Sequence, residues 1–173
     1  MSLKDYNNFV DGKWLNAENN LRFKSIDPST ENEWCTAPES SPGDVDQAVL
    51  AAKNAFKTWS VIDVEERAHY LRLLADKMLE HAEHLGRIET IDSGKLFTET
   101  KFQAQYMHDY FKFYENLLLN TSNEQVIPDI DKESMIVKEI YEPIGVLAFL
   151  LPFNSQSFLL TTKLAPALAA GCT

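Results

Sequence analysis

Several features that would point to specialised classes of protein are missing from this 173-residue sequence. The only two cysteines, Cys35 and Cys172, form no CxxC or Cys/His cluster, so they suggest no disulfide framework. The start, MSLKDYNNFV, has no apolar run of signal-peptide length, and no stretch approaches the ~18 consecutive apolar residues of a membrane-spanning helix. We therefore expect a reducing, cytoplasmic setting and no membrane partner.

Positive charge is also scarce. There are 16 basic and 26 acidic residues, and the net charge of -10 works against binding to nucleic acid or to anionic membranes, since both are polyanions. The acidic residues are spread along the chain rather than gathered in a tail, which indicates a solvated surface. The hydrophobic content of 45% is typical of a soluble globular protein, and the length suffices for one domain with a core.

β-Strands are predicted in the first forty residues. Asp11 and Gly12 supply the two positive-φ residues of a type I′ turn, which predicts a hairpin over residues 8–15. A second strand pair is predicted at 21–26 and 34–37. The turn between them is Asp27-Pro28-Ser29-Thr30, because proline presets φ and aspartate caps locally.

Four helices are predicted in the next part of the chain. Ser41 is the expected N-cap of the first, with Asp44 three residues later, and Asp63 is the expected N-cap of the second. Gly94 ends the third. The fourth, over about 97–119, carries an aromatic stripe, for which packing in the core is favoured over a ligand surface. The stripe consists of Phe102, Tyr106, Tyr110, Phe113, Tyr114 and Leu117.

The chain changes character after residue 120. Residues 121–131 are polar and are predicted to form a loop, and 135–141 (MIVKEIY) predicts a strand suited to a sheet edge or an inter-subunit sheet. The unbroken apolar run 144–151 is typical of a strand buried on both faces of a parallel sheet. With the turn 152–154 and a helix over 155–170, it predicts the first βα unit of a nucleotide-binding sheet.

Motifs along nearly the whole chain resemble those of the aldehyde dehydrogenase superfamily. The segments EPIGV, PFN and KLAPALAAGCT are similar to the family's EPxGV, P[WF]N and KxAPALAAG motifs. Upstream segments fall in family order and spacing, namely NNFVDGKW, IDPST, DVDQAVLAAKNAF, ERAHYLRLLAD, ETIDSGK and YFKFYENL. The resemblance implies an α/β fold in which hairpins and helices lead into the first strand–helix unit of a parallel nucleotide-binding sheet.

The same resemblance implies three parts of the chain. Residues 1–128 would be the hairpin and helical part of the cofactor-binding domain, and 129–142 an oligomerisation or edge-strand segment. Residues 143–173 would be the incomplete start of the Rossmann-like sheet.

Functional roles near the end of the chain follow from the resemblance. Asn154 matches the asparagine whose side-chain amide donates to the oxyanion of a thiohemiacetal, a type of contact worth about 2.7–4 kcal/mol in oxyanion holes. Lys163 matches a lysine sometimes assigned to a charge relay, although a lysine on an apolar helix also snorkels to solvent. The implied cofactor is NAD or NADP, and the segment that would line its nicotinamide and ribose is Leu150, Leu151, Pro152, Phe153 and Asn154.

A further match concerns a monovalent cation. Ser25 and Ile26, through their backbone carbonyls, and Asp92 match an intrasubunit cation site of parts of the family. The alternative is that Asp92 belongs to a plain helix exit. Cys172 is not expected to be a nucleophile, because it lies in a helix-exit turn with no nearby histidine or helix N-terminus to lower its pKa.

The sequence departs from the family next to Asn154. Ser155-Gln156-Ser157 follows it where the family usually has an aromatic residue and then proline, so a fixed φ at the helix start is lost. Phe153 stands in place of the commoner tryptophan. The family's ribose-binding lysine and glutamate, glutamate base and catalytic cysteine would come later than Thr173.

Three hypotheses remain. The first is the amino-terminal part of a homo-oligomeric enzyme, a dimer or tetramer, that oxidises an aldehyde to a carboxylic acid with NAD(P) through a cysteine thiohemiacetal. Because its nucleophile and base are not in these residues, the chain alone is expected to be inactive. The second is a non-catalytic truncated paralogue that binds other dehydrogenase subunits through the strand at 135–141. The third is a redox-sensing thiol protein that uses Cys35 and Cys172.

Overall fold

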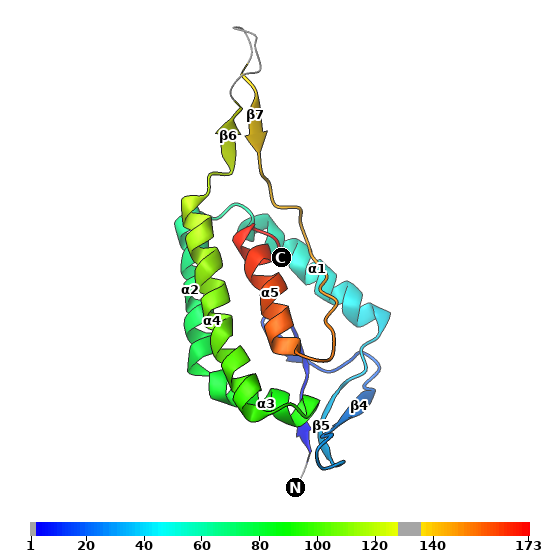
Figure 1. Cartoon of the computed structure of the whole chain (residues 1–173). Helices are drawn as coiled ribbons and strands as arrows, with labels where there is room; N and C mark the ends of the chain where they lie inside the picture. The colour runs from blue at the N-terminus through cyan, green and yellow to red at the C-terminus, as the bar shows by residue number, and fades with distance from the viewer. Residues whose placement is uncertain (1–2, 128–135) are drawn as a thin grey trace.

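The computed structural model describes residues 3–127 and 136–173, and within these residues it contains five helices and three small sheets (Figure 1). In chain order the elements are β1 (Lys4–Asp5), β2 (Asn8–Val10), β3 (Lys13–Leu15), β4 (Arg22–Ile26), β5 (Glu33–Pro38), α1 (Pro42–Trp59), α2 (Val64–Glu80), α3 (Ala82–Ser93), α4 (Phe97–Asn120), β6 (Glu124–Val126), β7 (Lys138–Ile140) and α5 (Gln156–Ala169).

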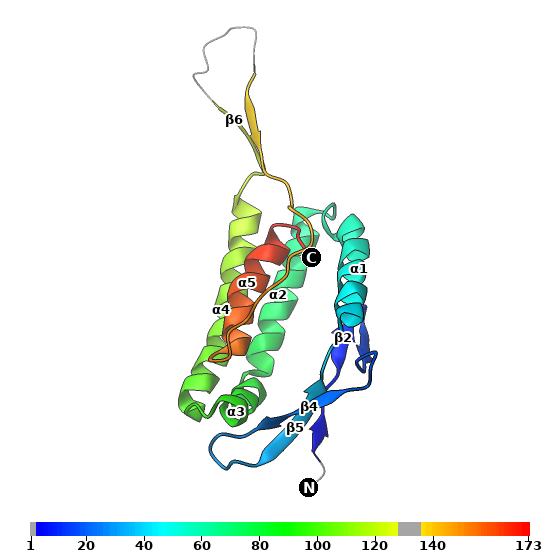
Figure 2. The ribbon, with the colours of Figure 1, turned by 90° about the vertical axis from the view of Figure 1, so that its right-hand side faces the viewer.

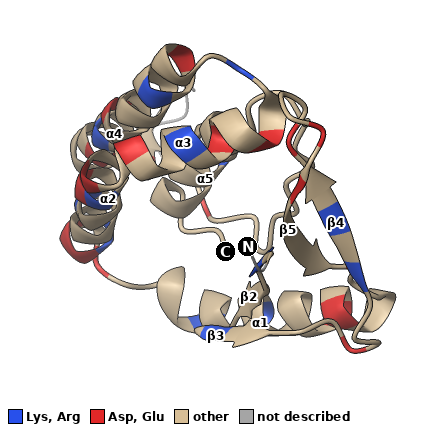
Figure 3. Cartoon of the chain, turned by 90° about the horizontal axis from the view of Figure 1, so that it is seen from below, with Lys and Arg blue, Asp and Glu red and all other residues tan. Residues whose placement is uncertain are grey.

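Helices α2, α4 and α5 pack side by side, and α3 crosses beneath them (Figures 1 and 2). The sheet β1–β5–β4 lies at the same end as α3, whereas the hairpin β6–β7 projects from the opposite end. Seen from below, basic and acidic residues are interspersed along α2, α3 and α4 (Figure 3). Mixed charge on these helices agrees with the solvated surface predicted from the sequence. No helix of the described residues is both long enough and apolar enough to span a bilayer.

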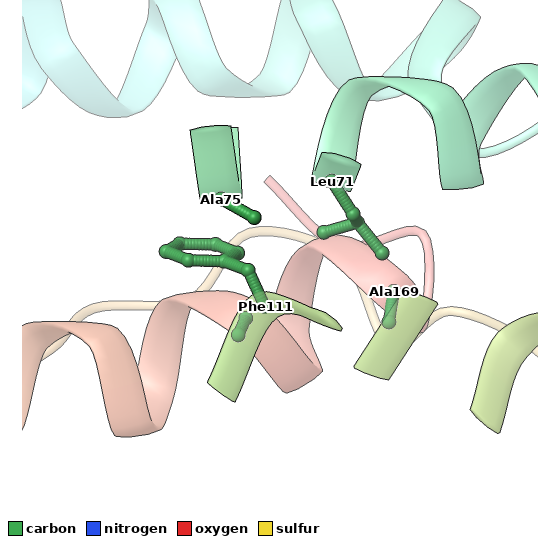
Figure 4. Packing of buried hydrophobic residues seen from close by; sticks show 5 residues of the cluster. Leu71, Ala75, Phe111 and Ala169 are labelled. Atoms are coloured by element: carbon green, nitrogen blue, oxygen red, sulfur yellow. The ribbon is translucent and has the colours of Figure 1, made fainter. Parts of the chain in front are cut away.

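The main core lies where α2, α4 and α5 meet (Figure 4). Leu71 and Ala75 of α2 are one helical turn apart, so they present one face to the fully buried Phe111 of α4. Helix α5 contributes Ala165 and Ala169, also four residues apart. Their small side chains let α5 approach the other two helices closely, and burial of a side chain such as Leu71 stabilises the fold by about 1.5–3 kcal/mol.

Local signals in the first hundred residues are confirmed. Asp11 and Gly12 have φ values of 51° and 73° at the β2–β3 turn. The Ser41 hydroxyl accepts from the Asp44 N–H, and the Asp44 carboxylate accepts from the Ser41 N–H, which forms the reciprocal capping box at the start of α1. Gly94 ends α3 in the left-handed conformation, with φ of 74°. These signals act over a few residues, which is why the sequence alone predicts them.

The prediction for the aromatic stripe of α4 was largely wrong. Tyr110 and Tyr114 are half-buried, but the other four members, Phe102, Tyr106, Phe113 and Leu117, are exposed. The face of α4 that packs is formed instead by Thr100, Ala104, Met107, Phe111 and Glu115. Spacings of three or four residues define a helix face but do not determine which of two faces meets α2 and α5.

Two predictions after residue 120 also need correction. Residues 124–126, predicted to be loop, form β6, which pairs antiparallel with β7 so that Glu124 faces Ile140. The strand predicted over 135–141 is confirmed for 138–140, while residue 135 lies outside the described residues, as do 128–131 of the predicted loop. Pairing across the hairpin supplies the backbone hydrogen bonds that overcome the low strand propensity of β6.

The prediction of a buried strand over 144–151 was wrong. The segment is extended but is not a strand, and Ile144 and Leu150 are 85% and 88% exposed. A strand buried on both faces needs neighbouring strands and covering helices, and no strand of the described residues pairs with this segment. The segment makes one pair of hydrogen bonds of the kind found between parallel strands. The Thr173 N–H donates to the Gly145 carbonyl, and the Leu147 N–H donates to the Thr173 carbonyl.

The crossing of α3 and α4 depends on the absence of a side chain at Gly86. A Cβ there would lie 2.8 Å from Lys101 Cα and 2.9 Å from Lys101 N, both of them backbone atoms that cannot rotate away. We predict that Gly86→Ala destabilises the protein by about 1–3 kcal/mol, even though alanine is the better helix former. Thermal unfolding measures the effect, with the exposed His84→Ala on the same helix as control. Equal melting temperatures for the two variants would contradict this packing.

Candidate functional site

Asn154 lies in the turn that joins the extended segment 144–151 to α5. The turn is formed by Phe153 and Asn154, and α5 begins at Gln156. Asn154 is exposed, and Phe153 and Leu150 are among the most exposed apolar side chains, at 87% and 88%. The segment predicted to contact a cofactor therefore presents apolar side chains and one amide to the exterior.

Lys163 connects α5 to this segment. Its Nζ donates to the Leu150 carbonyl at 3.1 Å, so the side chain occupies a backbone acceptor that pairs with no strand of the described residues. The alternative predicted from the sequence was that the Lys163 ammonium group would extend to solvent, and in the structure it hydrogen-bonds to the Leu150 carbonyl. The charge-relay role implied by the resemblance stays a prediction.

Asp92, at the end of α3, links three elements that are distant in the sequence. Its Oδ1 accepts from Ser25 Oγ of β4 at 2.6 Å, and its Oδ2 accepts from Gln156 Nε2 of α5 at 3.2 Å. Trp34 Nε1 in turn donates to Ser25 Oγ at 3.1 Å. The structure therefore brings together Ser25 and Asp92, two of the three residues predicted to hold a cation.

The oxygen groups around Asp92 fit a hard cation in kind, because such ions prefer carboxylate, hydroxyl and carbonyl ligands. Ile26, the third predicted ligand, follows Ser25 at the end of β4. The described residues contain no group of three or more His, Cys, Asp or Glu side chains able to hold a metal. A cation here would depend on the backbone carbonyls of Ser25 and Ile26, and this role stays a prediction.

A second polar cluster, around Lys95, was not predicted from the sequence. Lys95 Nζ donates to Ser155 Oγ at 2.7 Å and to Gln103 Oε1 at 2.6 Å, and lies 3.5 Å from the buried Glu89 carboxylate. The one sequence feature that could have indicated this cluster is the position of Lys95, directly after the helix-ending Gly94. Ser155 is 60 residues away from Lys95 in the chain, however, so no local pattern reveals this contact.

Similarity to known proteins extends over this whole arrangement. The model of the family described as "Aldehyde dehydrogenase family" matches residues 14–173, which include the Asn154 turn and both polar clusters. The chain belongs to the aldehyde dehydrogenase family.

Relatives from bacteria and plants support the assignment. The chain is 36% identical over 173 residues to (Z)-2-((N-methylformamido)methylene)-5-hydroxybutyrolactone dehydrogenase of Acinetobacter baylyi, covering 99% of this chain and 35% of the relative. It is 37% identical over 170 residues to the peroxisomal aminoaldehyde dehydrogenase 1 of Pisum sativum, covering 95% and 34%. The chain therefore spans about a third of the length of the curated relatives it matches.

The fold agrees with solved aldehyde dehydrogenase structures. A betaine aldehyde dehydrogenase from Staphylococcus aureus, solved in complex with NAD+, superposes with a TM-score of 0.90 at 32% identity, over 96% of this chain and 33% of that one. The predicted α/β, aldehyde-dehydrogenase-like fold class is thereby confirmed. Because the similar proteins named are dehydrogenases, the comparisons favour the enzyme hypothesis over a non-catalytic paralogue.

Both thiols of this aldehyde dehydrogenase chain are buried and unpaired. Burial raises the pKa of the Cys35 thiol, and the nearby Asp92 carboxylate raises it further. A raised pKa lowers the thiolate fraction at neutral pH, and the thiolate is the reactive form. The geometry therefore gives no support to the thiol-sensor hypothesis.

We predict that Cys35 reacts with iodoacetamide at neutral pH at least about tenfold more slowly in the native protein than after denaturation, because its thiol is both buried and protonated. Mass spectrometry of the peptide containing Cys35 measures the two rates. Equal labelling rates in the two states would show that the thiol is accessible and would revive the sensor hypothesis.

Proposed function

We propose that this chain provides the oxyanion donor and the nicotinamide-contacting segment of an enzyme that oxidises an aldehyde to a carboxylic acid with NAD or NADP. The observation that carries the proposal is the exposed Asn154 residue, which lies in a turn between an exposed apolar segment and the partly buried helix α5. The nucleophile and base of that enzyme are not among the residues of this chain in recognisable form.

The proposed role of Asn154 is to donate a hydrogen bond from its side-chain amide to the oxyanion. When a cysteine thiolate attacks an aldehyde carbon, the carbonyl oxygen becomes an anion, and a preorganised amide N–H that points at it lowers the barrier. An amide in a fixed turn satisfies this requirement better than one on a free loop, because little reorganisation is needed as charge develops. NAD or NADP, when bound, accepts the hydride from the same carbon.

Cofactor contact is assigned to the segment that precedes Asn154. Leu150, Leu151 and Phe153 are exposed, so apolar surface is available to cover the flat nicotinamide ring. Lys163 holds the backbone at Leu150 through its hydrogen bond to the carbonyl. The NAD+ complex of the Staphylococcus aureus enzyme supports nicotinamide dependence in the family.

The proposal extends to assembly as a homo-oligomer through the hairpin β6–β7. The hairpin projects from the helices and exposes Val126, Ile140 and Tyr141 (Figure 2). Within the described residues, the outer edges of both strands pair with no other strand, and free edges with exposed apolar side chains favour pairing with another chain. An inter-subunit sheet formed through β7 would give its edge a hydrogen-bonding partner and would cover the exposed apolar side chains.

The oxyanion role predicts a kinetic effect. In the complete gene product, Asn154→Ala should lower kcat for aldehyde oxidation by about 10²–10³-fold, because one oxyanion donor is lost. NADH or NADPH formation measures the rate, and NAD(P)+ affinity should change little. The matched control is Asn54→Ala, which removes an exposed amide on α1 whose oxygen only accepts from Lys57. If kcat stays within threefold of the unmodified protein, Asn154 is not the oxyanion donor.

The cofactor role predicts a different effect for a neighbouring residue. Phe153→Ala should raise the Kd for NAD+ or NADP+ several-fold, because apolar contact with the nicotinamide half is lost. Ile144→Ala is the control, since Ile144 is 85% exposed on the same segment but lies away from the turn. Isothermal titration of the complete gene product compares the two. Equal shifts for both variants would indicate a general change of the segment rather than a cofactor contact.

A further inference from the structure

The start of α5 lacks the side-chain cap that usually begins a helix. Ser155 occupies the N-cap position with φ of -163° and ψ of 59°, and its side chain makes no capping hydrogen bond. A serine at this position normally accepts from an N–H of the first turn. The hydroxyl of Ser155 is used for a contact outside the helix instead.

That contact is with Lys95, whose side chain is partly buried, at 19% exposed. Lys95 Nζ donates to Ser155 Oγ at 2.7 Å and is held in place by Gln103 of α4 at 2.6 Å and by the Glu89 carboxylate of α3. Ser155 itself is only 7% exposed. Because an ammonium group with little access to water needs acceptors from the protein, the Lys95–Ser155 bond is costly to break.

A second contact holds the next residue. Gln156 Nε2 donates to Asp92 Oδ2 at 3.2 Å, and Asp92 is held by Ser25 on its other oxygen at 2.6 Å. The N-cap residue and the first residue of α5 are thus bonded to Lys95, which lies between α3 and α4, and to Asp92 at the end of α3. Gln156 stands where the family usually has proline, and the side-chain hydrogen bonds of Ser155 and Gln156 supply a restriction that a fixed φ would otherwise give.

We propose that Ser155, through Lys95, is a positioning residue for the Asn154 amide, with Gln156 as a second anchor. Asn154 is exposed, whereas Ser155, the next residue, is buried, so the turn has a fixed end directly beside the catalytic amide. Since consecutive Cα atoms are about 3.8 Å apart, a shift of Ser155 moves Asn154 almost equally. This inference rests on the proposed oxyanion role of Asn154.

The test is a double-mutant cycle in the complete gene product. Ser155→Ala should lower kcat by about 10–100-fold, the loss expected when a catalytic group is misplaced by about 1 Å, while KM for the aldehyde changes less than twofold. Ser155→Thr keeps the hydroxyl and should restore most of kcat. The double variant Asn154→Ala/Ser155→Ala should be no slower than Asn154→Ala alone, because Ser155 acts only through Asn154.

Thr162→Ala is the matched control. It removes a hydroxyl from α5 that bonds only to the Leu159 carbonyl of the same helix, so kcat should stay unchanged. Crystal structures of the unmodified protein and of Ser155→Ala provide a readout that does not depend on activity, and the Asn154 amide should be displaced or disordered in the variant. If Ser155→Ala does not fold, Gln156→Ala removes the other anchor and should show the same pattern.

The outcomes separate the two proposals. Multiplicative losses in the double variant, or an unmoved Asn154 amide in Ser155→Ala, overturn the positioning role while leaving the oxyanion role intact. A normal kcat in Asn154→Ala overturns the oxyanion role instead. In that case the crystal structures alone decide whether Ser155 positions the turn.

Discussion

The close packing of α5 against α2 and α4 is the constraint on which the remaining structure depends. Ala165 and Ala169 of α5 lie against Leu71 and Phe111, and a larger side chain at either alanine would push the helix outward. Because α5 starts directly after the Asn154 turn, the same contact that forms the core also determines where that turn lies. Core packing and site geometry are therefore coupled through one helix.

Polar contacts complete the placement at the other end of α5. The Lys95–Ser155 and Asp92–Gln156 hydrogen bonds join the end of α3 and the connection that follows it to the start of α5, and Ser25 extends the link to β4. Apolar packing is not directional, whereas hydrogen bonds between partly buried groups require defined distances and angles. The alanines thus hold the helix close, and the hydrogen bonds determine its rotation and the direction of the turn.

The extended segment 144–151 before the turn has fewer hydrogen bonds and less burial than the helices. It makes two backbone hydrogen bonds to Thr173 and one, at the Leu150 carbonyl, to Lys163, while several of its apolar side chains face outward. Exposed apolar side chains and free backbone groups at one place are suited to contacts with further strands or with a flat ligand.

Local chemistry was predictable from the sequence alone. The Asp11-Gly12 turn, the Ser41–Asp44 capping box and the Gly94 helix end depend on contacts within a few residues, and the motifs along nearly the whole chain together indicated the family. Only the tertiary structure decided which face of α4 is buried, that residues 144–151 remain extended without becoming a strand, and that Lys95 reaches Ser155 across 60 residues. The physical reason is that burial and strand pairing are properties of neighbours in space, and periodicity along the chain does not name those neighbours.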